Sequence, residues 1–271
     1  MTESISRQDQ FVAIVLAGDR TENDPVAIEA GVSCKAIAPI CGRAMILLVL
    51  DALEQSELVN TIVLCGPPEA SLKDCPELVK KIEQSNISWL PSLASPSQSV
   101  EAALLNIKEN AYVLLTTADH ALLRSQTVSY FLSQSLASKV DATVGLVEFK
   151  TIHDAYPEVK RTVIKMSDGG YCGCNLFAFL NIKGRKLVPF WRQVEQSRKK
   201  PARMIASILG NWAVLLYLMG KLTLDSALAR VSNRIKLEIK PIIIPFPEAG
   251  VDVDTAKDRE FVERILRDSK D

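Results

Sequence analysis

The chain has 271 residues, 48% of them hydrophobic, and a mean hydropathy of +0.12. It can bury the core of one large α/β domain or two small ones, so disorder is excluded as the main state. Lysines and arginines number 32, as do aspartates and glutamates. With no net charge to attract polyanions, we expect neither a nucleic-acid partner nor charge-driven binding to anionic membranes.

The first ten residues are polar and lack the apolar core of a secretory signal, so we expect a cytoplasmic protein with reduced thiols. Cys172 and Cys174 form a lone C-x-C pair, and the chain has only two histidines, which argues against a zinc site. The apolar stretch 204–219 is about 16 residues long, short of the ~20 that span a bilayer. We therefore expect no stable membrane insertion and interpret this stretch as a buried or interface helix.

The first half of the chain alternates short apolar runs with helical patterns. The apolar runs predict buried strands at 11–17, 61–65, 112–117 and 142–147. The helical patterns lie at 45–55, 76–84, 97–107 and 127–138. This alternation predicts right-handed βαβ units and a parallel sheet.

The pattern changes after residue 148. Segments 161–166 and 175–179 follow each other without a helix, joined by a turn at 167–170, which predicts antiparallel pairing. Residues 185–234 are helical in pattern and locally basic.

A last strand at 239–244 and a helix at 256–267 end the predicted order of elements. The fold class is therefore α/β, a three-layer α/β/α Rossmann-like mixed sheet, mostly parallel. We predict a single domain over 1–271 with a helical insertion at about 185–234.

Ligands of open parallel sheets bind beyond the carboxyl ends of the strands, and the first strand ends there at Leu16, Ala17 and Gly18. A glycine lets the backbone approach a phosphate closely, and Arg20 and Lys35 would supply positive charge. Alternatively, Gly18 makes only a turn and both cations are solvated. The residues alone leave these two interpretations open.

Asp119 follows the strand that ends in Thr116 and Thr117. At a strand end that faces a phosphate loop, its carboxylate could hold Mg²⁺, which needs one or two carboxylates plus substrate phosphates. Alternatively, Asp119 caps the next helix, which is the better interpretation when the residue is taken alone.

Two further carboxylates, Asp252 and Asp254, alternate with valines in the segment AGVDVDTAKD. We expect them to point in opposite directions, so that only one joins Asp119 at a metal. Asp254 or Thr255 can cap the terminal helix. Asp252 is then the freer carboxylate and the predicted second metal ligand.

Four segments in this order, spread over nearly the whole chain, carry a family resemblance: LAGDR…CKAIAPICGRAMI, LLTTADHALL, GGYCGCNLFAF and VDVDTAKDREFVERIL. They resemble the MobA-like nucleotidyltransferases, which have a glycosyltransferase-A-type fold of the nucleotide-diphospho-sugar transferase type. Members join an NTP to a phosphorylated acceptor, release pyrophosphate and use Mg²⁺. The resemblance implies the same substrates and cofactor here.

The resemblance also implies roles for residues of this sequence. The residues implied to bind nucleotide are Leu16, Ala17 and Gly18 at base and sugar, Arg20 and Lys35 at the phosphates, and Ser97 and Ser99 in the base-contacting stretch SLASPSQSVEAAL. Asp119 and Asp252 would bind the metal, while Gly173 and Asn175 would face the acceptor. Arg20, Lys35 and Asp119 would act in catalysis.

The predicted function is thus Mg²⁺-dependent nucleotidyl transfer from an NTP to a phosphorylated small-molecule acceptor, with release of pyrophosphate. A glycosyltransferase using a nucleotide sugar is an alternative, but TTAD lacks the D-x-D spacing that is usual for such enzymes. A second alternative is a nucleotide-binding regulator without turnover, since Asp19 stands where the family commonly has a second glycine. The insertion would cover the acceptor site or form a homodimer; acceptor and base stay open.

Overall fold

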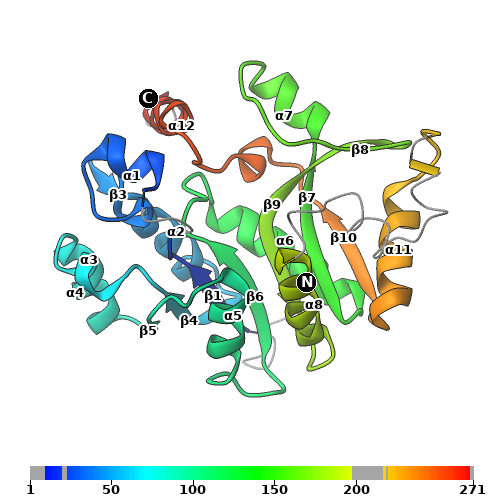
Figure 1. Ribbon diagram of the computed structural model, residues 1–271, viewed down its shortest axis with the longest axis horizontal. Helices are drawn as coiled ribbons and strands as arrows, with labels where there is room; N and C mark the ends of the chain where they lie inside the picture. Colours follow the sequence, from blue (N-terminus) through cyan, green and yellow to red (C-terminus); the bar gives the residue numbers. More distant parts are fainter. Residues whose placement is uncertain (1–9, 20–22, 197–215, 218, 269–271) are drawn as a thin grey trace, which may run out of the picture.

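The computed structural model describes residues 10–19, 23–196, 216–217 and 219–268 (Figure 1). Arg20, the basic stretch 198–203 and most of the apolar stretch 204–219 lie outside these described residues. The predictions made for them therefore stay predictions.

One eight-stranded sheet forms the centre of the molecule, in the order β10-β7-β9-β6-β1-β4-β5, with β8 paired to β9. Its strands are β1 Phe11–Leu16, β4 Val59–Cys65, β5 Ile87–Leu90, β6 Tyr112–Thr117, β7 Ala142–Glu148, β8 Ile164–Met166, β9 Gly169–Phe179 and β10 Ile239–Ile243. A separate pair joins β2 Pro39–Ile40 and β3 Arg43–Ala44. β9 runs antiparallel to both β6 and β7, which confirms the mixed, mostly parallel sheet.

Helices cover both faces of the sheet. The helices are α1 Pro25–Ala30, α2 Met45–Glu54, α3 Glu69–Leu72, α4 Pro76–Gln84, α5 Pro96–Leu104, α6 Ser125–Ser138, α7 Phe149–Ala155, α8 Leu187–Gln196, α11 Leu224–Ile235 and α12 Ala256–Asp268, with 3-10 turns η2 Lys35–Ile37, η3 Gly184–Lys186 and η4 Pro247–Gly250. Ala13 and Val15 of β1 pack into one core cluster with residues of α2 and α6. Ile14, facing the other way, packs with residues of α5 and α8, so the predicted three layers are confirmed (Figure 1).

The structure corrects three predicted boundaries. β9 begins at Gly169 and not at residue 175, because its first half pairs with β8 and the end of β7. The predicted strand from Arg161 is reduced to Ile164–Met166, and Arg161 lies in the preceding loop. α5 begins at Pro96, where the Ser95 hydroxyl accepts a hydrogen bond from the backbone of Gln98.

Short elements were missed for a physical reason. β5 has four residues and α1 has six, so neither shows a full hydrophobic period. α1 nevertheless carries local signals, since Asp24 caps it, Pro25 opens it and Gly31 ends it in the left-handed conformation.

The predicted insertion contributes α8 and α11 to the described structure. α8 packs on α5, and α11 packs beside β10 and contacts Leu146 and Tyr171 through Leu224. Among the described residues, no helix has the length and apolar character needed to cross a membrane. All six cysteines are free, and of these Cys41 alone is exposed.

Gly184 joins the end of β9 to α8 by a close backbone approach. A Cβ atom at this position would lie 2.1 Å from the carbonyl oxygen of Asp141. That oxygen already accepts a hydrogen bond from Leu180, and the amide of Gly184 donates to Asn181. The backbone therefore has no freedom to move aside.

We predict that Gly184→Ala lowers the free energy of unfolding by about 1–3 kcal/mol, the usual cost of overpacking. Urea denaturation measures this free energy. An unchanged dependence of the free energy on urea concentration would show that unfolding is still cooperative. Gly173→Ala is the matched control, because its Cβ would meet nothing within 4 Å. Equal denaturation midpoints for both variants would contradict the assigned close approach.

Candidate functional site

The carboxyl ends of three parallel strands meet at one edge of the sheet. Leu16 at the end of β1 pairs in register with Cys65 of β4 on one side and with Thr117 of β6 on the other. Gly18 and Asp119, each two residues beyond its strand, therefore lie at the same edge. Both line a small cavity of about 30 Å³ together with Lys35. The predicted convergence of these three residues is confirmed.

Lys35 connects three segments that are distant in sequence. Its ammonium group donates hydrogen bonds to Asp119 Oδ2 and to Asp254 Oδ1, each at 2.9 Å. Its backbone N–H donates to both carboxylate oxygens of Asp19, at 3.0 and 3.1 Å. Burial alone would lower the pKa of Lys35, but the carboxylates of Asp119 and Asp254 outweigh it and raise the pKa above its ordinary value. Lys35 is thus a fixed cation at the tip of β1.

Asp119 is held from several sides. The Thr117 hydroxyl donates to its Oδ1 at 2.5 Å, and the backbone N–H of Val253 donates to its carbonyl oxygen at 3.0 Å. Burial tends to raise the pKa of Asp119, but the charge of Lys35 and these side-chain hydrogen bonds hold it below its ordinary value. Asp119 is therefore an ionised, half-buried carboxylate whose charge is directed into the site. These contacts do not make it a helix cap, because α6 begins only at Ser125.

The two carboxylates after β10 occupy different surroundings from those expected. The expectation of opposite directions is wrong, because residues two apart in an extended segment share a face. Val251 and Val253 are buried, while Asp254 reaches Lys35. Burial raises the pKa of Asp252, and the charge of Arg161 opposes that rise. The negative charges of Asp254 and Asp119 raise the pKa further, so the three carboxylates share one electrostatic environment.

Asp252 is also not the freer of the two carboxylates. It forms an ion pair with Arg161, which donates a second hydrogen bond to its carbonyl oxygen at 2.9 Å. The side chain of Asp252 is 29% exposed and that of Asp254 is 61% exposed. Thr255 caps α12, since its hydroxyl accepts from the Asp258 backbone and the Asp258 carboxylate accepts from the Thr255 backbone. Capping is therefore done by Thr255, and Asp254 is left to pair with Lys35.

Arg161 is a charged residue beside the carboxylates that sequence reasoning missed. Its side chain is almost fully buried, at 8% exposure, and it lies 3.9 Å from Asp258 as well as against Asp252. No local signal marks it, since a single arginine in a loop is usually solvated. Only the packing of the 156–163 loop on the segment before α12 places it in the site.

Gly173 and Asn175 were expected to face the acceptor, and the structure places both within β9. Gly173 pairs with Leu146, and Phe177 pairs with Val144, so β9 carries extra residues at this point. Asn175 adopts a positive φ of 52° in this bulge and donates to Asp252 Oδ2 at 3.4 Å. The bulge turns its amide toward the carboxylates, while Gly173 borders open space.

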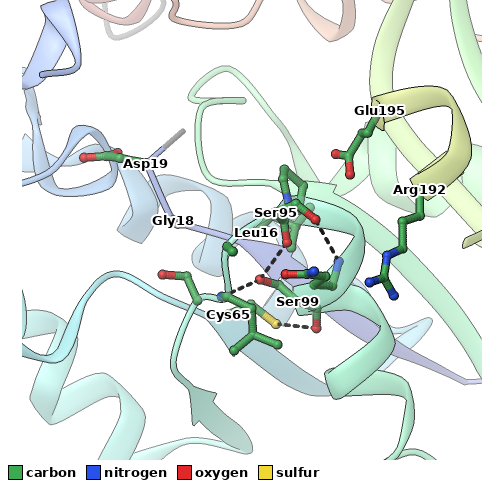
Figure 2. Close-up of a pocket in the computed structure, with 13 residues that line it drawn as sticks. Leu16, Gly18, Asp19, Cys65, Ser95, Ser99, Arg192 and Glu195 are labelled. Atoms are coloured by element: carbon green, nitrogen blue, oxygen red, sulfur yellow. Dashed lines mark hydrogen bonds between the residues drawn. The ribbon is translucent and has the colours of Figure 1, made fainter. Parts of the chain in front are cut away.

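A larger pocket of about 380 Å³ adjoins the small cavity and shares Leu16, Gly18 and Asp19 with it. Figure 2 shows the tip of β1 on one side and α8 on the other, with the start of α5 between them. A Cβ on Gly18 would lie 2.6 Å from Cβ of Ser92, so this approach requires glycine. The volume of the larger pocket is in the range of small-molecule sites.

Of the two serines predicted to contact nucleotide, only Ser99 lines the pocket. Its hydroxyl accepts from the backbone of Leu93 at 2.9 Å. Ser97 is fully buried, and its hydroxyl donates to Glu195 Oε2 at 2.6 Å. Ser97 therefore acts on the pocket through Glu195, a residue that sequence reasoning did not select. Ala17 is buried and lines the small cavity.

His120 follows Asp119 but is completely buried, and burial lowers the pKa of its imidazole to about 4. It is neutral at pH 7. In the ranges that the structure describes, no group of three or more histidine, cysteine, aspartate or glutamate side chains forms a metal site.

Solved structures resemble this chain over almost its whole length. A hypothetical transferase from Thermus thermophilus is 28% identical, with a TM-score of 0.77, and the match covers 92% of this chain and 99% of that one. 4-Diphosphocytidyl-2C-methyl-D-erythritol synthase from Anaerococcus prevotii is 13% identical, with a TM-score of 0.57 and coverages of 96% and 97%. CMP:2-keto-3-deoxy-manno-octonic acid synthetase complexed with CTP is 11% identical, with a TM-score of 0.57 and coverages of 96% and 100%. The last two show a shared fold.

No curated protein matches the chain. Residues 13–159, which include the end of β1, Lys35 and Asp119, match the model of the MobA-like NTP transferase domain. This span is more than half of the chain, and it contains the two strand ends and the cation that form the small cavity. The chain therefore belongs to the MobA-like NTP transferase family.

Proposed function

We propose that this protein transfers a nucleotidyl group from an NTP to a phosphorylated small-molecule acceptor, with release of pyrophosphate and with Mg²⁺ as cofactor. The observation that carries the proposal is the position of the Lys35 ammonium. It lies between Asp119 and Asp254, at the glycine tip of β1, beside a pocket large enough for a nucleoside. Phosphates that reach the edge of the small cavity would meet this cation directly.

In the proposed reaction, an oxygen of the acceptor phosphate forms a bond to the α-phosphorus of the NTP. The bond from that phosphorus to the bridging oxygen breaks, and pyrophosphate leaves with the electron pair. The acceptor phosphate is already an anion at neutral pH, so no side chain has to remove a proton from it. His120 is buried, which agrees with a reaction in which it transfers no proton.

The residues present fit Mg²⁺ through the chemistry of their donors. Mg²⁺ prefers oxygen ligands and usually takes one or two carboxylates plus substrate phosphates. Asp119 would be one ligand, and Asp252 or Asp254 the other. When bound, the ion supplies positive charge that stabilises the phosphates during transfer.

Lys35 would take a second role once a nucleotide is bound. Its ammonium is now balanced by two carboxylates, and phosphate oxygens would compete with them for its hydrogen bonds. Catalysis then depends on positioning and on charge stabilisation by Lys35, joined by Arg20. The open space at Gly173 and the amide of Asn175, which reaches Asp252, leave room for the acceptor.

A regulator that binds nucleotide without turnover is the second candidate. The observation in its favour is Asp19, whose carboxylate lines both cavities and adds negative charge where phosphates would bind. Pyrophosphate release separates the two functions. A nucleotide that stabilises the fold in a thermal-shift assay, without release of pyrophosphate across a panel of phosphorylated acceptors, would favour the regulator.

We predict that Asp119→Ala abolishes pyrophosphate release while circular dichroism stays that of the folded protein, because the variant loses a ligand for the ion. Pyrophosphate is measured by a coupled assay with each NTP, Mg²⁺ and phosphorylated acceptors. Asp154→Ala is the matched control, since Asp154 pairs with Lys150 on an exposed surface of α7. Wild-type turnover in Asp119→Ala would refute the role of Asp119.

The second metal ligand is tested by comparing Asp252→Asn with Asp254→Asn. Mn²⁺ binding, followed by the loss of its free electron paramagnetic resonance signal in the presence of NTP, reports affinity without turnover. We expect Asp252→Asn to weaken Mn²⁺ binding about tenfold or more, as loss of a ligand or its support does. An effect confined to Asp254→Asn would transfer the ligand role to Asp254.

The pairing of Lys35 with Asp119 predicts a pH-dependent stability difference. In Lys35→Met, Asp119 loses its main partner, so burial raises its pKa and the variant is about 3 kcal/mol less stable at pH 7. The wild-type Asp119 pKa is low, so its contribution is present above the unfolded pKa of about 4 and is lost only as the pH falls through the lower folded value. In the variant, protonation of Asp119 at its raised pKa removes the penalty as the pH falls. The difference in the free energy of unfolding between the two proteins should therefore narrow from pH 7 toward pH 4.

Urea denaturation at each pH measures this gap. Lys150→Met is the control, because Lys150 is exposed and its partner Asp154 stays solvated. A stability difference that does not change with pH would show that Lys35 stabilises the fold by packing alone and not by balancing Asp119.

A further inference from the structure

We propose that Glu195 of α8 selects nucleoside triphosphates whose base carries an exocyclic amino group. The inference rests on the proposed function, since it concerns the same pocket, and it names the substrate class that the family assignment leaves open. α8 lies outside the 13–159 span that matches the family model, so the family assignment does not itself cover this residue.

The placement of Glu195 identifies which part of a nucleotide it would meet. It lines the larger pocket from α8, across from Gly18 and Asp19 (Figure 2). It does not line the small cavity that contains Lys35 and Asp119. A carboxylate beside the triphosphate would repel it, whereas at the end remote from Lys35 it faces the base.

The carboxylate of Glu195 is fixed in the pocket by a buried hydroxyl. Ser97 is fully buried and donates to Oε2 at 2.6 Å, and its hydroxyl lies 3.1 Å from that of Ser95. Within the part of the chain that the structure describes, Oε1 has no hydrogen-bond partner. The neighbouring Arg192 pairs with Glu101 at 2.9 Å and so does not engage Glu195. One oxygen is thereby held in place while the other can accept a hydrogen bond.

An ionised carboxylate can only accept hydrogen bonds. The amino groups of guanine, cytosine and adenine donate to such an acceptor, as glutamate does in reading cytosine N4. Uracil presents a carbonyl oxygen where cytosine has its amino group, and hypoxanthine lacks the amino group of guanine. An oxygen facing Glu195 would be repelled and a missing donor would leave it unpaired, so either change weakens binding.

Equilibrium binding by isothermal titration calorimetry tests this with nucleotide pairs that differ at the amino group: GTP against ITP, ATP against ITP, and CTP against UTP, all with Mg²⁺. We expect at least one amino-bearing nucleotide to bind about tenfold more tightly than its partner, and the pair that shows this names the base. In Glu195→Gln this ratio should fall toward one, because an amide can donate as well as accept. Glu83→Gln, an exposed position on α4, is the matched control and should keep the wild-type ratio.

Two results would overturn the inference and leave nucleotidyl transfer standing. One is tight binding by the wild type with equal affinities in all three pairs. The other is an equal loss for every nucleotide in Glu195→Gln, which would assign Glu195 to the ribose or to the packing of α8. If no nucleotide binds the wild type, the proposed function fails together with the inference.

Discussion

The site depends on one charge balance: a lysine ammonium held between carboxylates that come from segments far apart in sequence. Lys35 opens η2, Asp119 follows β6 and Asp254 precedes α12, and two hydrogen bonds of 2.9 Å bring the three together. Asp119 would be costly to bury without the cation, and the cation would be costly to bury without its carboxylates. The ends of the sheet therefore meet as an electrically matched set and not as a collection of solvated loops.

The same balance explains why the neighbouring segments are so firmly attached. The backbone of Val253 donates to the carbonyl of Asp119, and Arg161 holds Asp252 from the other side. The segment before α12 is thus tied to the end of β6 by main-chain and side-chain contacts. Because its alternate residues Val251 and Val253 are buried, its carboxylates are left facing the site.

Much of this arrangement could be predicted from the sequence, since long apolar runs identify buried strands and strand ends identify the ligand edge. Gly18 and Asp119 were placed at that edge in this way, while the family resemblance assigned their roles and that of Lys35. The partner of Asp252 was not predicted, because Arg161 gives no periodic or local signal in the sequence and reaches the site only through tertiary packing. The bulge at Asn175 was missed for the same reason: an asparagine within an apolar run does not reveal that two extra residues must be accommodated there. Glu195 lay in a stretch whose helical pattern shows an amphipathic face but not what that face contacts.

The Ser97 to Glu195 hydrogen bond joins α5, within the span that defines the family, to α8, which lies beyond it. One wall of the pocket is therefore built from outside the family span. A substitution in α8 would alter the charge offered to a ligand while the strand ends keep their own contacts.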